Sequence, residues 1–203
     1  MPRYKDSQRE NSRSSTRQQL INAAITEIAE KGFDNANINH ISLAAGFAKG
    51  TIYNYFPSKD ALMLALVEEI GGCHAACIAN EVRQETDPAA RLRRFFLAGF
   101  RYIEDHPAAA QFLLTALYST HQEFREAMFS AYRPMFQVMG EDILTVGIAQ
   151  GVFRPVDIQS TTTLLLTLYL GSGSQRDSNR KVYQNPETVA DFAIQALIFR
   201  RHQ

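Results

Sequence analysis

The sequence NINHISLAAGFAKGTIYNYFPSK occupies residues 37–59, where short apolar groups are separated by glycines. Asn37 can cap a helix over about residues 38–45, because its side chain can accept a hydrogen bond from a free N–H of the first turn. Gly46 ends that helix, and a second short helix is expected over about residues 48–55. Two short helices joined by a glycine turn predict a helix-turn-helix.

Upstream of this segment, apolar residues recur at helical spacing. They predict a helix that follows Ser14-Ser15-Thr16 and ends at Lys31-Gly32, with its apolar face made by Ile21, Ala24, Ile25 and Ile28. Residues 1–15 carry several basic side chains without apolar periodicity, so a flexible basic arm is expected there. That arm is either an inert tail or a segment that becomes ordered on a polyanion.

Downstream, prolines and glycines divide the chain into five or six helices. These are predicted near residues 59–80, 88–105, 107–118, 121–149, 157–170 and 186–200, and Ser58 can cap the first of them. Residues 171–185 are polar and predict a loop, and Pro134 is expected to kink its helix. The predicted fold is all-α with about nine helices. It comprises the arm (1–15), a three-helix helix-turn-helix domain (16–60) and a C-terminal helical bundle (61–203).

The composition is that of an ordinary globular chain of 203 residues, with 45% hydrophobic and 21% charged residues. Residues 1–62 hold eight basic and six acidic side chains, and the rest hold thirteen and fifteen. A mildly basic head on a mildly acidic body fits local contact with a polyanion. Neither a secretory signal nor a membrane segment is evident, so a cytoplasmic protein without membrane contact is expected.

The stretch IAEKGFDNANINHISLAAGFAKGTIYNYFPSKDALMLAL (residues 28–66) resembles the DNA-binding domain of the TetR family of transcriptional regulators. The matching positions are Gly32-Phe33, Ile41, Ala45-Gly46, Lys49-Gly50-Thr51-Ile52-Tyr53, Tyr55-Phe56, Ser58-Lys59 and Leu62. The resemblance implies a homodimer that binds a roughly palindromic double-stranded operator. It also implies a small-molecule ligand in the C-terminal body, with repression and ligand-induced release as the default.

The predicted second helix presents polar side chains suited to base edges. Asn54 can pair bidentately with adenine, Lys49 can donate to guanine, and Thr51 offers a methyl group for thymine. The resemblance adds phosphate contacts from Tyr53, Tyr55 and Lys59. The full set of candidate DNA-binding residues is Asn37, Asn39, His40, Lys49, Gly50, Thr51, Tyr53, Asn54, Tyr55 and Lys59. For Asn39 and His40, a solvated helix end is the alternative.

Two residues depart from the family pattern. Ala48 stands where the family often places Ser or Thr, which removes a hydroxyl that could cap the second helix. Ser42 stands where Ala is usual, a change that is tolerable if its hydroxyl bonds back to the helix.

The middle of the chain concentrates aromatic and methionine side chains. Given the resemblance, they predict a pocket for a largely apolar ligand, with plain core packing as the alternative. The candidate lining residues are Phe96, Phe100, Phe112, Tyr118, Phe129, Tyr132, Phe136 and Met139. The candidate polar anchors are Arg101, Gln111, His121 and Arg133.

The last two helices carry more apolar residues than a thin body can bury. They predict a dimer interface, with intrachain core as the alternative, formed by Leu164, Leu165, Leu168, Tyr169, Val189, Phe192, Ala193, Ala196 and Leu197.

Cys73, His74 and Cys77 lack the spacing of a structural zinc site, so two buried free cysteines are expected, with metal or redox sensing as the lesser hypothesis. No cofactor and no metal are predicted. No catalytic constellation stands out, so an enzyme is not expected. The rival to a DNA-binding regulator is a sensor on the same scaffold that no longer recognises specific DNA.

Overall fold

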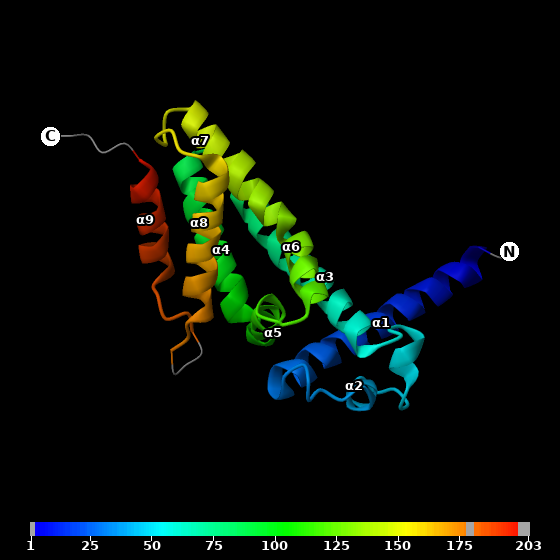
Figure 1. Cartoon of the computed structure of the whole chain (residues 1–203). Coiled ribbons are helices and arrows are strands. Elements are labelled where there is room, and N and C mark those ends of the chain that lie inside the picture. Colours follow the sequence, from blue (N-terminus) through cyan, green and yellow to red (C-terminus); the bar gives the residue numbers. More distant parts are fainter. Residues whose placement is uncertain (1–2, 178–180, 199–203) are drawn as a thin grey trace. The chain divides into compact units, whose positions relative to one another are not determined.

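The computed structural model describes residues 3–177 and 181–198, with side chains described from residue 11 onward. The described chain is all-α, as predicted (Figure 1). It divides into two compact units, the first Met1–Glu68 with Ala108–Ala127 and the second Glu69–Pro107 with Met128–Gln203. The sequence-based division near residue 60 did not associate residues 108–127 with the N-terminal part.

The first unit contains the predicted helix-turn-helix segment. Its elements are α1 (Arg3–Lys31), α2 (Ile38–Ala44), the 3-10 helix η1 (Thr51–Asn54), the beginning of α3 (Lys59–Val82), α5 (Pro107–Leu117) and the beginning of α6 (Gln122–Gln137). Its core includes Ile21, Ile41, Ile52, Leu62 and Phe124, all at most 1% exposed.

Helix α1 begins at Arg3, so the prediction of a flexible arm over residues 1–15 is wrong from that residue onward. The sequence there is polar but rich in Arg, Lys, Gln and Glu, which are good helix formers. A helix can therefore continue through this stretch without an apolar face. The side chains of Arg3, Lys5 and Arg9 lie outside the described ones.

Local capping signals were read correctly. Gly32 adopts a left-handed φ of 76° after α1. The side chain of Asn37 accepts hydrogen bonds from the N–H groups of Asn39 (2.9 Å) and His40 (3.4 Å). Ser58 Oγ likewise accepts from the N–H of Ala61 at 3.0 Å, at the start of α3. These contacts satisfy N–H groups that a helix start leaves free.

The predicted second helix over residues 48–55 is much shorter in the structure. Only Thr51–Asn54 is helical, as the 3-10 turn η1, and Gly50 precedes it with a left-handed φ of 84°. A right-handed helix cannot pass through a residue in that conformation, so residues 48–50 form a turn instead.

The second unit is also helical. It contains the remainder of α3 and α6, together with α4 (Pro88–Asp105), the π-helix η2 (Val138–Thr145), α7 (Val146–Ala149), α8 (Ile158–Ser174) and α9 (Pro186–Leu197). In Figure 1, α4, α8 and α9 lie side by side. Phe95, Phe96, Phe100 and Tyr169 are fully buried between α4 and α8.

Three boundaries in this unit differ from prediction. Helix α8 continues to Ser174 instead of ending near residue 170, and α9 ends at Leu197; residues 199–200 of the predicted helix lie outside the described residues. Within the predicted loop, an isolated bridge pairs Arg176 with Val182. The predicted helix over 121–149 is divided by η2, which begins four residues after Pro134. A proline contributes no N–H to the helical ladder, which favours a change of hydrogen-bond register nearby.

Helix α3 is long and apolar enough to cross a membrane by length and composition alone, and it is the single such helix among the described residues. Half of its most apolar window is buried inside the protein, as in the core helix of a globular domain.

Candidate functional site

The turn around η1 exposes the side chains that the sequence assigned to base recognition. Lys49, Tyr53 and Asn54 are exposed and Thr51 is half-buried, while Ile52 is completely buried. One buried anchor with polar neighbours directed outward is the arrangement that a groove-reading element needs. The shortened helix leaves this exposed set unchanged.

Ser42 lies in the core and contacts the recognition turn η1. It is fully buried in α2, and its hydroxyl oxygen accepts a hydrogen bond from the backbone N–H of Ile52 at 3.1 Å. The hydrogen bond that this hydroxyl accepts therefore comes from the next element and not from its own helix. It joins α2 to η1 instead.

The start of α2 is organised by a carboxylate that the sequence analysis did not single out. Glu27 accepts hydrogen bonds from the Lys31 ammonium (2.8 Å) and the Asn37 N–H (3.3 Å), and it lies 3.8 Å from His40. The Lys31 hydrogen bond lowers the pKa of Glu27. Asn39 and His40 are exposed, whereas the side-chain oxygen of Asn37 is occupied by its capping role.

The candidate phosphate ligands at the end of this segment already have partners. The Lys59 ammonium donates to the Asp34 carbonyl at 2.9 Å and lies 4.8 Å from the centre of the Phe33 ring. The guanidinium of Arg13 lies 5.9 Å from the centre of the Tyr55 ring. The Lys59 ammonium has three N–H donors and uses one of them on the Asp34 carbonyl. The others can donate to a phosphate, so Lys59 can still contact DNA.

Phe33 links these residues to the segment that joins the first unit from later in the chain. Its ring packs edge-to-face on Phe124 at 5.3 Å and on His121 at 6.3 Å between centroids. Phe33, whose ring carries the Lys59 ammonium on its face, is thus held by Phe124 of α6 and by His121, which directly precedes α6.

The predicted ligand-pocket residues do not form one group. Phe96, Phe100, Tyr132 and Met139 are buried in the second unit, while Phe112 is buried in the first. Tyr118 and Phe129 are 76% and 60% exposed, so they do not belong to the buried aromatic groups of either unit. Phe136 is half-buried.

The four predicted polar anchors are all exposed, and their role in ligand binding stays a prediction. Arg101 additionally faces Glu81 at 3.8 Å. Arg101, Gln111 and Arg133 fall on outward positions of their helices, where long polar side chains keep their heads in water, and His121 directly precedes α6.

The buried polar group of the second unit is His74, which the sequence analysis considered only as a metal ligand or sensor. Its Nδ1 lies 2.8 Å from the hydroxyl of Tyr132, and its Nε2 lies 2.7 Å from the hydroxyl of Tyr169. Tyr102 stacks on its ring with centroids 4.4 Å apart. Burial lowers the pKa of His74 to about 3, so the imidazole is neutral at physiological pH.

Two glycines make room for this cluster. A Cβ at Gly71 would stand 2.8 Å from Ala131 and 3.4 Å from the Tyr132 ring, and one at Gly99 would stand 2.6 Å from Tyr169. Both glycines therefore leave room for tyrosine rings that come from distant helices, and such a pairing is not visible in a linear sequence.

The cysteines are not both buried. Cys73 is exposed and Cys77 is half-buried, and burial raises the pKa of the Cys77 thiol. Among the described residues, no group of three or more His, Cys, Asp and Glu side chains is placed to hold a metal ion.

Five of the predicted interface residues are buried within the chain itself, which corrects their assignment. They are Leu165, Tyr169, Val189, Ala193 and Leu197. Leu164 and Phe192 are 68% and 66% exposed, Ala196 is exposed and Leu168 is half-buried. Helical periodicity identified the apolar residues correctly but could not divide them between the intrachain core and the outer face.

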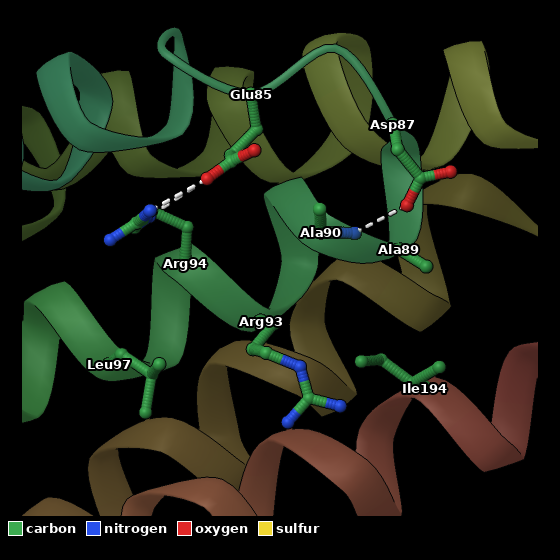
Figure 2. Close-up of a pocket in the computed structure, with 8 residues that line it drawn as sticks. All are labelled: Glu85, Asp87, Ala89, Ala90, Arg93, Arg94, Leu97 and Ile194. Carbon is green, nitrogen blue, oxygen red and sulfur yellow. Dashed lines mark hydrogen bonds and ion pairs between the residues drawn. The ribbon is translucent and has the colours of Figure 1, made fainter.

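Two surface pockets are described in the second unit. One, of about 470 Å³, lies between α8 and α9 and includes Leu168 and Phe192. The other, of about 410 Å³, lies between α4 and α9 and is shown in Figure 2. There Arg94 pairs with Glu85, and Arg93 points toward α9, where it pairs with Glu187 and Asp191. Neither pocket is lined by a predicted ligand-pocket residue.

Comparison with known proteins agrees with this architecture. The family model described as bacterial regulatory proteins, tetR family, matches residues 20–66. The HTH-type transcriptional repressor KstR2 of Mycobacterium tuberculosis is 27% identical over 142 residues, which cover 70% of this chain and 71% of the relative.

Solved structures share the fold across both units. The transcriptional regulator FadR from Bacillus subtilis in complex with stearoyl-CoA superposes with a TM-score of 0.76 at 21% identity, covering 91% of this chain and 99% of that one. A regulator from Saccharomonospora viridis in complex with choline has a TM-score of 0.80 at 23% identity, covering 92% and 100%.

Proposed function

This chain is a TetR-family, DNA-binding transcriptional regulator, and from that premise we propose that it is a cytoplasmic, homodimeric repressor released from its operator by an apolar small molecule. The observation that carries the DNA-binding part is the exposure of Lys49, Tyr53 and Asn54 around a buried Ile52. The KstR2 relatives, which are named as repressors, support the sign of regulation.

The proposed mode of DNA binding follows from the size of the recognition element. A single four-residue turn offers few base contacts, so two copies reading successive major grooves are needed for specific binding. Asn54 and Lys49 are proposed to read base edges, and Thr51, Tyr53, Tyr55 and Lys59 to contact phosphates. Half-sites about 34–36 Å apart, or a multiple of that distance, are expected.

The proposed dimer interface lies on the exposed side of α8 and α9. Leu164 and Phe192 are large apolar side chains that remain mostly exposed in the single chain, and Ala196 and Leu168 extend the same set. Exposed apolar groups of this kind mark protein contacts in soluble proteins. A two-fold interface uses the same surface of both subunits, so each of these residues would be buried in both copies.

The proposed effector is apolar because the interior of the second unit is lined by aromatic and methionine side chains. Phe95, Phe96, Phe100, Met135 and Met139 are at most 2% exposed. The structural neighbours bind chemically different molecules, stearoyl-CoA in one and choline in another, so the fold alone does not select the effector. His74 uses both ring nitrogens on Tyr132 and Tyr169, so a polar end of such a molecule would have to replace one of these hydrogen bonds.

Release of DNA then requires the effector to favour one conformation of the regulator over another. Helix α3 contributes Lys59 to the first unit and His74 to the second, and is the proposed connection between effector binding and DNA affinity.

Selection of binding sites from a random duplex pool, at low and at moderate salt, tests the proposal. Enrichment of an inverted repeat with helical-turn spacing is the expected result. Binding without enrichment that disappears steeply with salt would reduce the interaction to phosphate attraction and favour a sensor without specific DNA recognition. Once an operator is known, titration with stearoyl-CoA tests release: an acyl effector lowers operator affinity, and an unchanged affinity would exclude this probe.

A further inference from the structure

The recognition turn η1 lacks a cap of its own. The first N–H groups of any helix have no partner within it and are normally satisfied by a side chain just upstream. Here the residue at that position is Gly50, which makes no side-chain hydrogen bond, and Ala48 carries no hydroxyl. The backbone supplies two contacts, from the Thr51 N–H to Ala48 (3.1 Å) and from the Tyr53 N–H to Gly50 (3.0 Å).

The remaining N–H, that of Ile52, is satisfied from the neighbouring helix. Ser42 Oγ accepts it at 3.1 Å, and both residues are 0% exposed. Water cannot replace a partner at a site this buried, so the hydroxyl is the acceptor on which this N–H depends. Ser42 also accepts through its carbonyl from the Phe47 N–H at 2.9 Å. Ser42 therefore holds Phe47, at the beginning of the turn, through its carbonyl, and η1 through its hydroxyl.

These contacts determine which way the reading side chains face. Ile52 is held at two points, since its side chain is in the core and its N–H is on Ser42. A 3-10 helix turns by about 120° per residue, so fixing Ile52 also fixes the directions of its neighbours Thr51, Tyr53 and Asn54. A positioned side chain loses less freedom when it meets a base, which favours binding to the correct sequence.

We propose that Ser42 is a positioning residue of the DNA-reading surface: from α2 it caps η1, in place of the local cap that Ala48 does not provide. Ser42 itself is buried and does not meet DNA. The proposal rests on the proposed function, because it assumes that η1 reads the operator.

Four forms of the full-length protein test this role: the wild type, Ser42→Ala, Ala48→Ser and the double variant. Ser42→Ala is expected to lower affinity for the selected operator by at least tenfold and to leave affinity for an unrelated duplex unchanged. A hydroxyl at position 48 can accept from the N–H of Gly50 or Thr51. Ala48→Ser is therefore expected to restore part of the lost affinity in the double variant, because it holds the turn although the Ile52 N–H stays unsatisfied, and to change little in the wild type.

A control separates positioning from simple loss of stability. Ile28→Val removes one buried methyl group from α1 in the same unit without touching the turn. Its operator affinity is expected to remain within about twofold of the wild type. If Ser42→Ala and Ile28→Val weaken operator binding equally and Ala48→Ser does not rescue Ser42→Ala, the role of Ser42 is only structural and the proposal is overturned.

A second measurement needs no DNA. Hydrogen exchange of the peptide covering residues 48–56 is expected to be at least tenfold faster in Ser42→Ala than in the wild type. If the wild type binds a specific operator but Ser42→Ala changes neither exchange nor affinity, the positioning role is overturned while the proposed function stands. If exchange changes but the wild type enriches no operator, the cap exists and the proposed function fails, and with it the role in reading DNA.

Discussion

In the first unit the polar side chains proposed to meet DNA, Lys49, Tyr53 and Asn54, are exposed, whereas in the second unit His74, Tyr132 and Tyr169 bury their polar atoms in an aromatic core. Exposed groups contribute little to folding and can be replaced at the expense of function alone. Buried polar groups must keep their partners, because a lost partner leaves an unsatisfied atom without water. The two units should therefore respond to mutation and pH in different ways.

The largest expected effect is on DNA binding by Asn54→Ala. The dimer would lose one adenine contact in each half-site, each worth about 1–3 kcal/mol, so specific affinity is expected to fall by roughly 2–6 kcal/mol. The free energy of unfolding should change by less than about 0.5 kcal/mol, because the side chain is exposed. Fluorescence anisotropy with the selected operator and urea unfolding measure the two quantities.

Glu123→Ala, at another exposed position in the same unit, is the matched control and should alter neither quantity. Loss of stability without loss of specific binding in Asn54→Ala would reverse the contrast between the units.

Next in size is the loss of stability on replacing Tyr169 by alanine. Its side chain is 0% exposed and packs against Phe95 and Phe100, so removing it is expected to cost about 3–5 kcal/mol. Tyr183, which is 68% exposed, provides the matched control, and Tyr183→Ala should change stability by less than about 0.5 kcal/mol. Equal effects of the two substitutions in urea unfolding would contradict the buried placement of Tyr169.

The pH dependence of stability isolates His74. The unfolded chain binds a proton at this residue below its ordinary pKa of 6.5, whereas the folded protein does so only near a pKa of about 3. Its contribution to stability is therefore complete above pH 6.5 and is lost as the pH falls through this window. The linkage predicts a loss of about 2 kcal/mol between pH 7 and pH 5.

Urea unfolding at the two pH values measures this loss, and His74→Gln supplies the control, because glutamine does not titrate. The variant should be less stable at pH 7 but should lose less stability on acidification. An identical pH dependence in both proteins would show that other groups cause it.

The smallest expected effect concerns the ion pairs between α4 and α9. Arg93 pairs with Glu187 and Asp191, but its side chain is 38% exposed, so water screens these charges. Arg93→Ala is expected to cost at most about 1 kcal/mol at low salt, and the cost should disappear in 1 M salt. A loss of several kcal/mol that persists at high salt would mean that this surface network is as important to stability as the buried core.

Local signals in the sequence were reliable because their physical causes are local. The caps at Asn37 and Ser58 and the left-handed Gly32 each depend on residues within three or four positions. The exposed set around Ile52 was also predictable, because it follows from helical periodicity over a few residues.

Contacts between distant residues were missed or misassigned. The bond from Ser42 to Ile52 spans ten positions, and His74 finds its partners 58 and 95 positions away. The predicted interface and ligand residues proved to be divided between core and surface for the same reason, since an apolar pattern shows which side chains avoid water but not which neighbour covers them.

The sequence by itself therefore determined the all-α class, the helix-turn-helix segment and its resemblance to TetR-family regulators, because periodicity, caps and turn residues act over short distances. Only the tertiary structure decided where the polar interior lies, which apolar residues remain exposed and how the recognition turn is capped. Each of these depends on side chains that meet only after the chain has folded, when burial makes an unpaired polar atom costly.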